Sequence, residues 1–154
     1  MSLATLEWSP DQRWIAFNRV DSASGANELW LVEVDQRRAH KLVSGLNTVS
    51  GRGYAWMPDS RRLLVQLQPE GQGEAPPMNA TPTGPAVQET EISATVRQIR
   101  TYQDLLRNES DARVVEYYLR SQLATVDLAG SVVRAGAPQL YLAATPSPDG
   151  RHVL

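Results

Sequence analysis

The sequence predicts an all-β protein built from a repeated four-stranded antiparallel unit. Three observations support this prediction. A Pro-Asp pair occurs at residues 10–11, 58–59 and 148–149, each time ahead of an apolar stretch. The first two aspartates are 48 residues apart, the usual length of one four-stranded propeller blade. Runs of β-forming residues fill the intervals between the pairs. The predicted fold is a partial β-propeller of two blades plus the start of a third.

Each Pro-Asp pair is predicted to close a tight hairpin. Proline presets φ for the first central position of a type I turn, and aspartate suits the second. The next position favours a residue that tolerates the left-handed conformation, which Gly150 does best and Gln12 and Ser60 less well. Strands are expected directly after the turns, at residues 15–17, 63–67 and 153–154.

The remaining strands of each unit follow from a second repeated feature. Residues 28–35 resemble residues 122–128, because both are β-rich runs that stop at a turn. A short strand is expected after each run, at 39–43 in the first unit and at 132–134 in the second. Each unit therefore has about four strands.

The second unit carries a predicted insertion at about 69–120. Asp59 and Asp149 are 90 residues apart, 42 more than the first interval. The first half of the excess is rich in Gly, Pro and polar residues and predicts an exposed loop. The second half predicts helices that begin at Thr101 and Ser110. The apolar face of the second helix is expected to consist of Val114, Val115, Tyr118 and Leu119.

We treat residues 1–154 as a β-propeller fragment with blades at about 8–55 and 56–145 and the start of a third at 146–154. Propellers have four to eight blades, so we expect the chain to be part of a longer protein. The alternative is that several copies close a ring. An open two-blade piece exposes apolar blade faces, which favour self-association.

Composition excludes several classes of function. The chain has no cysteine, which excludes a disulfide framework, a thiolate zinc site and a cysteine nucleophile. Its net charge is −2 with both signs interspersed, and no apolar run is long enough to span a membrane, so neither nucleic acid nor membrane is an expected partner. Of the 15 basic residues 14 are arginine, which we interpret as a bacterial coding bias. The compartment stays open.

Neither a metal or cofactor site nor a catalytic residue is predicted. The chain has two histidines, and neither lies in a recognisable motif: His40 falls in an expected strand and His152 follows a turn. The three aspartates of the Pro-Asp pairs are expected to form turns. Trp8 and Trp56 occupy equivalent repeat positions and are expected in the core.

The insertion carries a more specific resemblance. The Pro-Asp turns alone resemble the repeat of TolB-like proteins and of prolyl oligopeptidase-family serine peptidases. Residues 80–90 (ATPTGPAVQET), 96–106 (VRQIRTYQDLL), 117–118 (YY) and 121–123 (SQL) resemble the glutamyl endopeptidase branch of that family. The stretch RTYQDLL is the most distinctive part, and the resemblance covers essentially the whole chain.

The resemblance implies a bacterial serine peptidase in which a propeller precedes an α/β-hydrolase domain with a Ser, Asp and His triad. This sequence has no Gly-x-Ser-x-Gly elbow and no hydrolase domain, so no triad residue is assigned. The implied role is a non-catalytic propeller segment that gates or orients peptide substrates for the hydrolase domain. The alternative is a TolB-like propeller scaffold for protein–protein interaction.

Arg97 and Arg100 are the candidate substrate-binding residues. A peptidase that selects glutamate needs a cation for the substrate carboxylate, and a guanidinium can bind it through two hydrogen bonds. Both arginines lie in the family-like stretch, three residues apart. The alternative is that they are solvated, or paired with Glu89 and Glu91.

Overall fold

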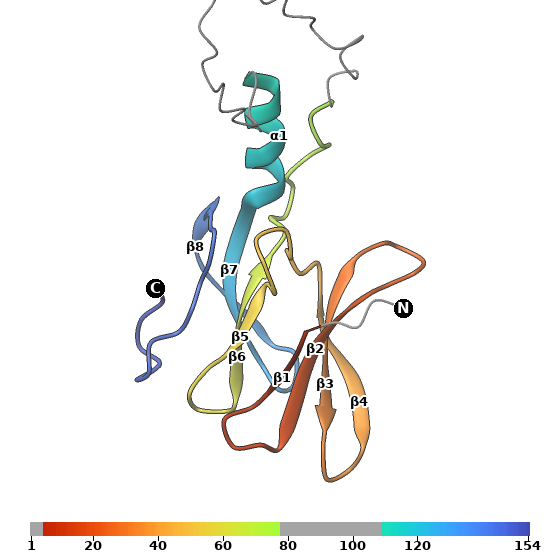
Figure 1. The fold of residues 1–154 in the computed structure, drawn as a ribbon, viewed down its shortest axis with the longest axis vertical. Helices are drawn as coiled ribbons and strands as arrows, with labels where there is room; N and C mark the ends of the chain where they lie inside the picture. The colour runs from red at the N-terminus through yellow and green to blue at the C-terminus, as the bar shows by residue number, and fades with distance from the viewer. Residues whose placement is uncertain (1–4, 78–108) are drawn as a thin grey trace, which may run out of the picture. The chain divides into compact units, whose positions relative to one another are not determined.

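The computed structural model describes residues 5–77 and 109–154 and consists of two four-stranded sheets and one helix (Figure 1). The first sheet has the strand order β1-β2-β3-β4 and the second β5-β6-β7-β8, with every neighbouring pair antiparallel. The strands are β1 (Leu6–Trp8), β2 (Trp14–Val20), β3 (Asn27–Glu33), β4 (Arg38–Ser44), β5 (Tyr54–Trp56), β6 (Arg62–Leu67), β7 (Arg120–Asp127) and β8 (Val132–Leu140). The prediction of two four-stranded antiparallel blades is confirmed.

The chain divides into two compact units. Described residues 5–73 and 118–154 belong to the unit that holds both sheets, and 74–77 and 109–117 belong to the other. Residues 69–77 form no helix or strand, in keeping with the predicted loop. The expected turn at Thr101 lies outside the described residues.

The repeat is visible in the strand register. In the first sheet β2 pairs with β3 from Trp14 opposite Glu33, and in the second β6 pairs with β7 from Arg62 opposite Asp127. Trp14 and Arg62 are 48 residues apart. Both sheets also have a register shift between their third and fourth strands, after Leu29 in the first sheet and before its equivalent Leu123 in the second. The two sheets are therefore built on one plan.

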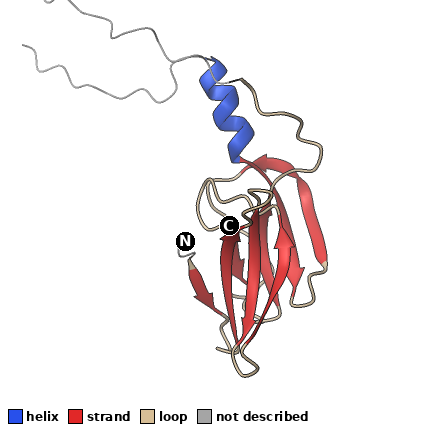
Figure 2. Cartoon of the chain, turned by 90° about the vertical axis from the view of Figure 1, so that its right-hand side faces the viewer, coloured by secondary structure: helices blue, strands red, loops and turns tan. Residues whose placement is uncertain are grey.

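The core lies between the two sheets, whose strands are seen in Figure 2. Alternate residues of a strand point to opposite faces, so each sheet contributes one face. The buried core residues are Ala16, Leu29, Leu31, Leu42, Leu46, Tyr54, Trp56, Leu63, Val65, Leu67, Ala124 and Val126. Along β6 both faces are buried, because Leu64 is only 2% exposed although it points away from this core.

The first and third Pro-Asp turns are stabilised by the same hydrogen bonds. The Ser9 hydroxyl donates to Asp11 Oδ1 (2.6 Å) and accepts from the Trp14 backbone N–H (2.9 Å). In the third turn the Ser147 hydroxyl donates to Asp149 Oδ1 (2.5 Å) and accepts from the His152 N–H (3.0 Å). The third turn also closes a ladder in which Thr145 and Leu154 exchange two backbone hydrogen bonds.

The second turn replaces the serine with Met57 and uses an arginine instead. Asp59 Oδ2 accepts from Arg62 Nε at 2.9 Å, while Asp59 Oδ1 accepts from the Arg61 N–H. The residue after each aspartate has a left-handed φ, as expected: 62° at Gln12, 56° at Ser60 and 68° at Gly150. The predicted turn chemistry is confirmed in all three repeats.

The insertion returns to the sheet through helix α1 (Glu109–Leu119), which confirms a helix in its second half. The helix begins one residue before Ser110. The expected packing of its apolar face is wrong for the described residues, because none in α1 is buried and Val115 and Tyr118 are 39% and 45% exposed. Helical spacing predicts that apolar side chains share one side of the helix, but they are buried only where another surface packs against that side.

Acid is expected to destabilise the turns. The Ser9 hydroxyl holds the pKa of Asp11 below its usual range, and Ser147 does the same for Asp149. A lowered folded-state pKa contributes stability above the unfolded value of about 3.9, and that stability is lost as the pH falls through the folded value. Asp11→Asn should therefore lower the free energy of unfolding at pH 7 and flatten its dependence on pH below 4.

Urea unfolding of the chain between pH 7 and pH 2 measures this effect. Asp35→Asn, at an exposed position in the β3–β4 turn, is the matched control and should follow the wild type. Equal free energies of unfolding for Asp11→Asn and wild type across this range would contradict the prediction.

Candidate functional site

Polar contacts join the start of the first sheet to the start of the second. The Trp56 indole N–H donates to the Glu7 carbonyl at 3.2 Å, and the Tyr54 hydroxyl donates to the carbonyls of Thr5 and Ala16. The Asp11 N–H donates to the Ser60 hydroxyl at 3.1 Å, which joins two successive Pro-Asp turns. These contacts fix the second sheet against the first.

Strand β4 contacts the turn that follows β7. His40 Nε2, on β4, lies 3.3 Å from the Leu128 carbonyl, and its ring meets that of Trp14 edge-on with 6.3 Å between centroids. Gly130 lies so close to β4 that a Cβ there would be 3.1 Å from the Leu42 carbonyl. His40 thus joins the edge of one sheet to the turn after β7.

Glu7, Arg52 and Tyr54 form a charged cluster between β1 and β5. Arg52 Nη1 lies 3.2 Å from Glu7 Oε2, and the guanidinium carbon is 5.9 Å from the centre of the Tyr54 ring. Burial raises the pKa of Glu7, although Arg52 opposes the shift. Burial and then the Glu7 charge raise the pKa of Tyr54 to about 12. Tyr54 therefore stays a neutral hydrogen-bond donor at physiological pH.

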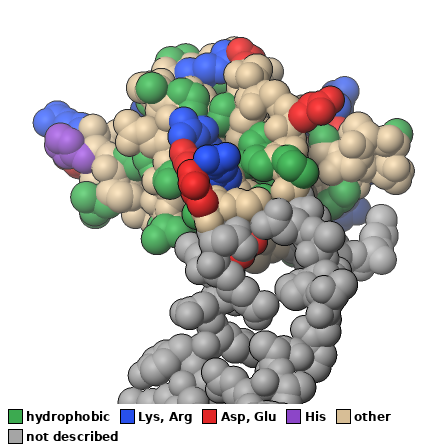
Figure 3. All heavy atoms as spheres, turned by 90° about the horizontal axis from the view of Figure 1, so that it is seen from above, with side chains coloured by type: hydrophobic (Ala, Val, Ile, Leu, Met, Phe, Trp, Pro, Cys, Tyr) green, Lys and Arg blue, Asp and Glu red, His purple; other side chains and the backbone are tan. Residues whose placement is uncertain are grey.

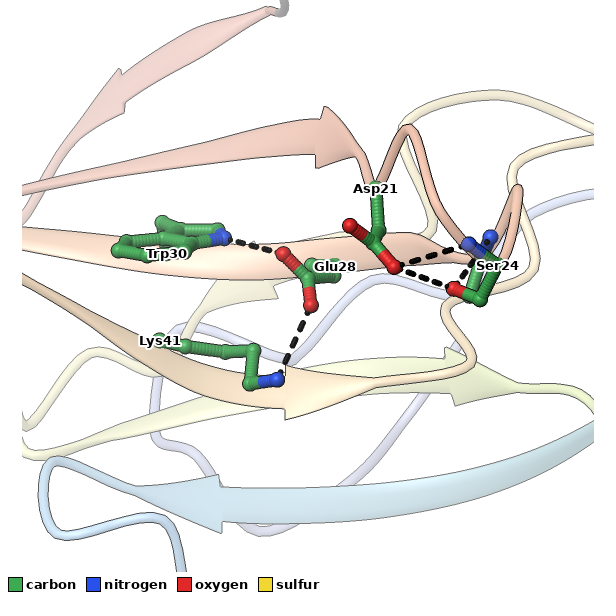
Figure 4. A network of polar contacts seen from close by, with 6 residues as sticks. Asp21, Ser24, Glu28, Trp30 and Lys41 are labelled. Carbon is green, nitrogen blue, oxygen red and sulfur yellow. Dashed lines mark hydrogen bonds and ion pairs between the residues drawn. The ribbon is translucent and has the colours of Figure 1, made fainter.

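Glu28 is the most buried carboxylate of the first sheet, with 6% exposure. Figure 4 shows its two oxygens accepting from the Trp30 indole N–H (2.8 Å) and from Lys41 Nζ (3.0 Å). These two hydrogen bonds lower the pKa of Glu28, so it stays ionised and paired. Nearby, the Ser24 N–H and hydroxyl both donate to Asp21 Oδ2.

The Glu28 contacts hold Trp30 at the register shift between Leu29 and Trp30. Phe17 stacks on Trp30 with ring centroids 6.4 Å apart, and the Arg19 guanidinium lies 5.1 Å from its centre. Gln122 is the equivalent of Glu28 in the second sheet. Glu28 pairs with Arg19, and Gln122 pairs with Leu67, which lies 48 residues after Arg19. Its amide donates to the carbonyls of Ala135 and Gly136 across the same kind of shift.

The structure describes some of the residues singled out from the sequence but not others. Arg97 and Arg100, with Glu89 and Glu91, lie outside the described residues. His152 is exposed and its backbone belongs to the third turn. Within residues 5–77 and 109–154 no group of three or more His, Asp or Glu side chains could hold a metal ion. No helix in that part of the chain has the length and apolar character to cross a membrane.

The expectation that both repeat tryptophans are core residues is right for Trp56 and wrong for Trp8. Trp56 is 6% exposed, whereas Trp8 is 53% exposed. The reason is position: Trp56 faces the first sheet, while Trp8 faces away from the second sheet. Trp8 belongs to what we call the open face, the side of the first sheet formed by Leu6, Trp8, Ile15, Phe17, Trp30 and Val32.

Basic and acidic side chains lie next to one another among hydrophobic ones on the face drawn in Figure 3. Exposed ion pairs of this kind include Arg62 with Asp59 at 2.8 Å. Such pairs contribute little to stability.

Two curated plant proteins match the chain. It is 36% identical over 155 residues to "Probable glutamyl endopeptidase, chloroplastic" of Oryza sativa subsp. japonica and 35% identical over 154 residues to the protein of that name from Arabidopsis thaliana. Each match covers 96% of this chain but 16% of the relative, so the chain spans about a sixth of the relatives' length. Both relatives come from plants, which gives no support to the bacterial origin expected from the arginine bias.

Solved structures give weaker likenesses. The β-propeller domain of the trilobed protease from Pyrococcus furiosus is 25% identical and covers 40% of this chain and 18% of its own, with a TM-score of 0.33. An acylaminoacyl peptidase from Pyrococcus horikoshii is 18% identical and covers 85% of this chain and 17% of its own, with a TM-score of 0.46. No protein-family model matches the sequence. The similarity of this chain to known proteins therefore rests on the two plant relatives.

The two repeat tryptophans should differ sharply when each is truncated. Trp56→Ala removes a buried ring and should lower the free energy of unfolding of the chain by about 3–5 kcal/mol. Trp8→Ala, the matched control at the equivalent position, should cost about 1 kcal/mol or less because the ring is half exposed. Urea unfolding followed by circular dichroism measures both, and equal losses would contradict the assignment of the core.

Proposed function

We propose that the chain, which over its length is similar to proteins named glutamyl endopeptidase, serves as a non-catalytic β-propeller segment of a prolyl oligopeptidase-family serine peptidase. In this proposal it gates or orients peptide substrates for a hydrolase domain elsewhere in a longer polypeptide. The observation that carries the proposal is the 36% identity that extends over 96% of the chain.

The chemistry of the described residues supports a scaffold and not a catalytic site. A serine nucleophile needs a base within hydrogen-bond reach and an oxyanion hole. His40 is engaged between the sheets and His152 lies in an exposed turn. The sequence has no Gly-x-Ser-x-Gly elbow. In this proposal peptide hydrolysis comes from residues outside this chain.

The insertion carries the candidate substrate-binding residues. Its two ends are anchored side by side, because Leu67 at the end of β6 pairs with Gln122 near the start of β7. The buried Asn47 amide donates to the carbonyls of Tyr118 (2.9 Å) and Arg120 (3.1 Å) and so fixes the point of return. A long connection held on a rigid scaffold is a common carrier of binding residues. We assign Arg97 and Arg100 to recognition of an acidic substrate side chain.

The isolated chain should not hydrolyse a chromogenic glutamyl peptide, whereas the full-length protein should. The test compares highly purified samples of both. Activity that co-purifies with the chain and disappears on substitution of one of its own serines would contradict the proposal. A full-length protein that has no hydrolase elbow and no activity would favour the interaction scaffold.

Arg97→Ala and Arg100→Ala in the full-length protein should each lower kcat/KM for glutamyl peptides by at least about tenfold, because loss of a desolvated guanidinium–carboxylate pair costs roughly 2–5 kcal/mol. Arg113→Ala is the matched control, since Arg113 forms an exposed ion pair with Glu109 in the same insertion. It should leave kcat/KM and the melting temperature unchanged. If both variants keep the wild-type kcat/KM, Arg97 and Arg100 are surface charges that do not recognise the substrate.

A further inference from the structure

Glu7, Arg52 and Tyr54 form a polar cluster that the repeat does not require. Residues 48 positions apart occupy matching places in the two sheets, so the equivalent of Glu7 in the second sheet is Ala55. Tyr54 likewise stands where the first sheet has Leu6. The repeat is built with apolar side chains at these places. The ion pair between Glu7 and Arg52 is therefore an addition to the repeat and not a condition of it.

The Arg52 guanidinium is held from two sides. Its Nη1 lies 3.2 Å from Glu7 Oε2, and its central carbon lies 5.9 Å from the centre of the Tyr54 ring. Tyr54 is itself fixed, because it is 6% exposed and its hydroxyl donates to the backbone carbonyls of Thr5 and Ala16. A planar cation that is already oriented loses less conformational entropy when it binds a ligand than a free side chain does.

Arg52 is accessible, and its guanidinium donates no hydrogen bond in the part of the chain that the structure describes. Its side chain is 42% exposed, against 26% for Glu7. The two form an ion pair only, because the buried Glu7 Oε2 has no hydrogen-bond partner. By contrast, Arg62, Arg113 and Arg134 each donate a hydrogen bond to a carboxylate of the chain. Arg52 therefore keeps its N–H groups for an acceptor from outside.

The backbone that carries Arg52 is fixed to the end of β6. Gly53 has a left-handed φ of 74° and lies against the Asn47 carbonyl, with which a Cβ at position 53 would collide. The Gly53 carbonyl accepts the Gln66 N–H at 2.8 Å, and the Gln66 carbonyl accepts the Asn47 N–H at 2.8 Å. The side chain of Asn47 also holds the return of the insertion. One rigid connection thus positions both Arg52 and the base of the insertion.

Arg52 lies at the end of the second sheet from which the insertion leaves. Tyr54, the first residue of β5, pairs with Val65, and the insertion begins after Leu67 at the end of β6. The Pro-Asp turns close the opposite end of the strands, where Arg61 is exposed. A peptide bound where the insertion joins the sheet is therefore on the side of Arg52 and not on that of Arg61.

We propose that Arg52 is a specificity-determining residue that binds a carboxylate of the peptide substrate; this rests on the proposed function. The guanidinium donates two hydrogen bonds to the carboxylate from the edge that Glu7 does not face, while Glu7 and Tyr54 hold its plane. This is a second carboxylate, besides the one assigned to Arg97 and Arg100. It belongs to an acidic side chain or to the C-terminus of the peptide, since both present the same two oxygens.

Nuclear magnetic resonance of the 154-residue chain tests carboxylate binding without reliance on catalysis. The probes are three acetylated hexapeptides: one with two aspartates and an amidated C-terminus, one with asparagines and a free C-terminus, and one with asparagines and an amidated C-terminus. The Arg52 Nε–Hε signal, assigned by its loss in Arg52→Lys, should shift saturably with a carboxylate peptide and not with the neutral one. The peptide that shifts the signal identifies the source of the carboxylate.

The Arg61 Nε–Hε signal is the internal control of the titration. It should show no saturable shift, because Arg61 is an exposed arginine at the opposite end of the strands. No saturable shift of the Arg52 signal with either carboxylate peptide overturns the proposal. An equal shift with the neutral peptide overturns it as well.

Arg52→Gln in the natural protein, at the length its gene encodes, separates recognition from a structural role. The variant should lower kcat/KM about fivefold for a glutamyl peptide with the second carboxylate and leave it unchanged for the matched peptide with an amide there. Arg61→Gln is the matched control and should leave both values unchanged. Equal losses with both peptides would make Arg52 structural and overturn the proposal. If the natural protein has no peptidase activity, the proposed function fails, while the titration still decides whether Arg52 binds a carboxylate.

Discussion

The face-to-face packing of two sheets is the contact on which the rest of the structure depends. Each sheet is apolar on the side that meets the other, and the residues between them form the continuous core of the described chain. Burial of apolar area is the main favourable contribution to such packing, and it requires a partner surface. A repeated sheet has two faces, and packing against one neighbour covers only one of them. The open face around Trp8 is the direct consequence.

Polar contacts determine which arrangement of the sheets is adopted. Apolar faces alone allow sliding, whereas a buried donor left without an acceptor is costly. The Trp56 indole, the Tyr54 hydroxyl and the Asp11 N–H each find a partner in the neighbouring sheet. Within each sheet, Glu28 and Gln122 span the register shift between the third and fourth strands. These contacts fix the alignment that the hydrophobic packing stabilises.

The second sheet holds both ends of the insertion. The strands on either side of the insertion are paired with each other, so a long segment leaves and re-enters a rigid sheet at one place. Asn47 holds the re-entry point through two hydrogen bonds to backbone carbonyls. In the function we propose, residues carried by the insertion recognise an acidic peptide side chain. The sheets would contribute through precise placement of that insertion.

The sequence by itself determined the local features of this protein. Proline, aspartate and a left-handed third residue specify each turn through their own φ preferences and side-chain hydrogen bonds. The 48-residue spacing of Asp11 and Asp59, with the 42-residue excess that follows, placed the blades and the insertion without any knowledge of distant contacts. The helix at 109–119 followed from capping and periodicity.

Only the tertiary structure decided which side chains are buried and which groups meet. Trp8 and Trp56 have the same local sequence context, yet one is half exposed and the other buried, because a neighbouring sheet covers only the second. The apolar side of α1 has helical spacing but no buried residue. The Glu28, Trp30 and Lys41 contacts join two strands across a register shift, and His40 reaches a carbonyl 88 positions away. Burial and long-range hydrogen bonds depend on what lies opposite a residue in space, and sequence spacing carries no record of that.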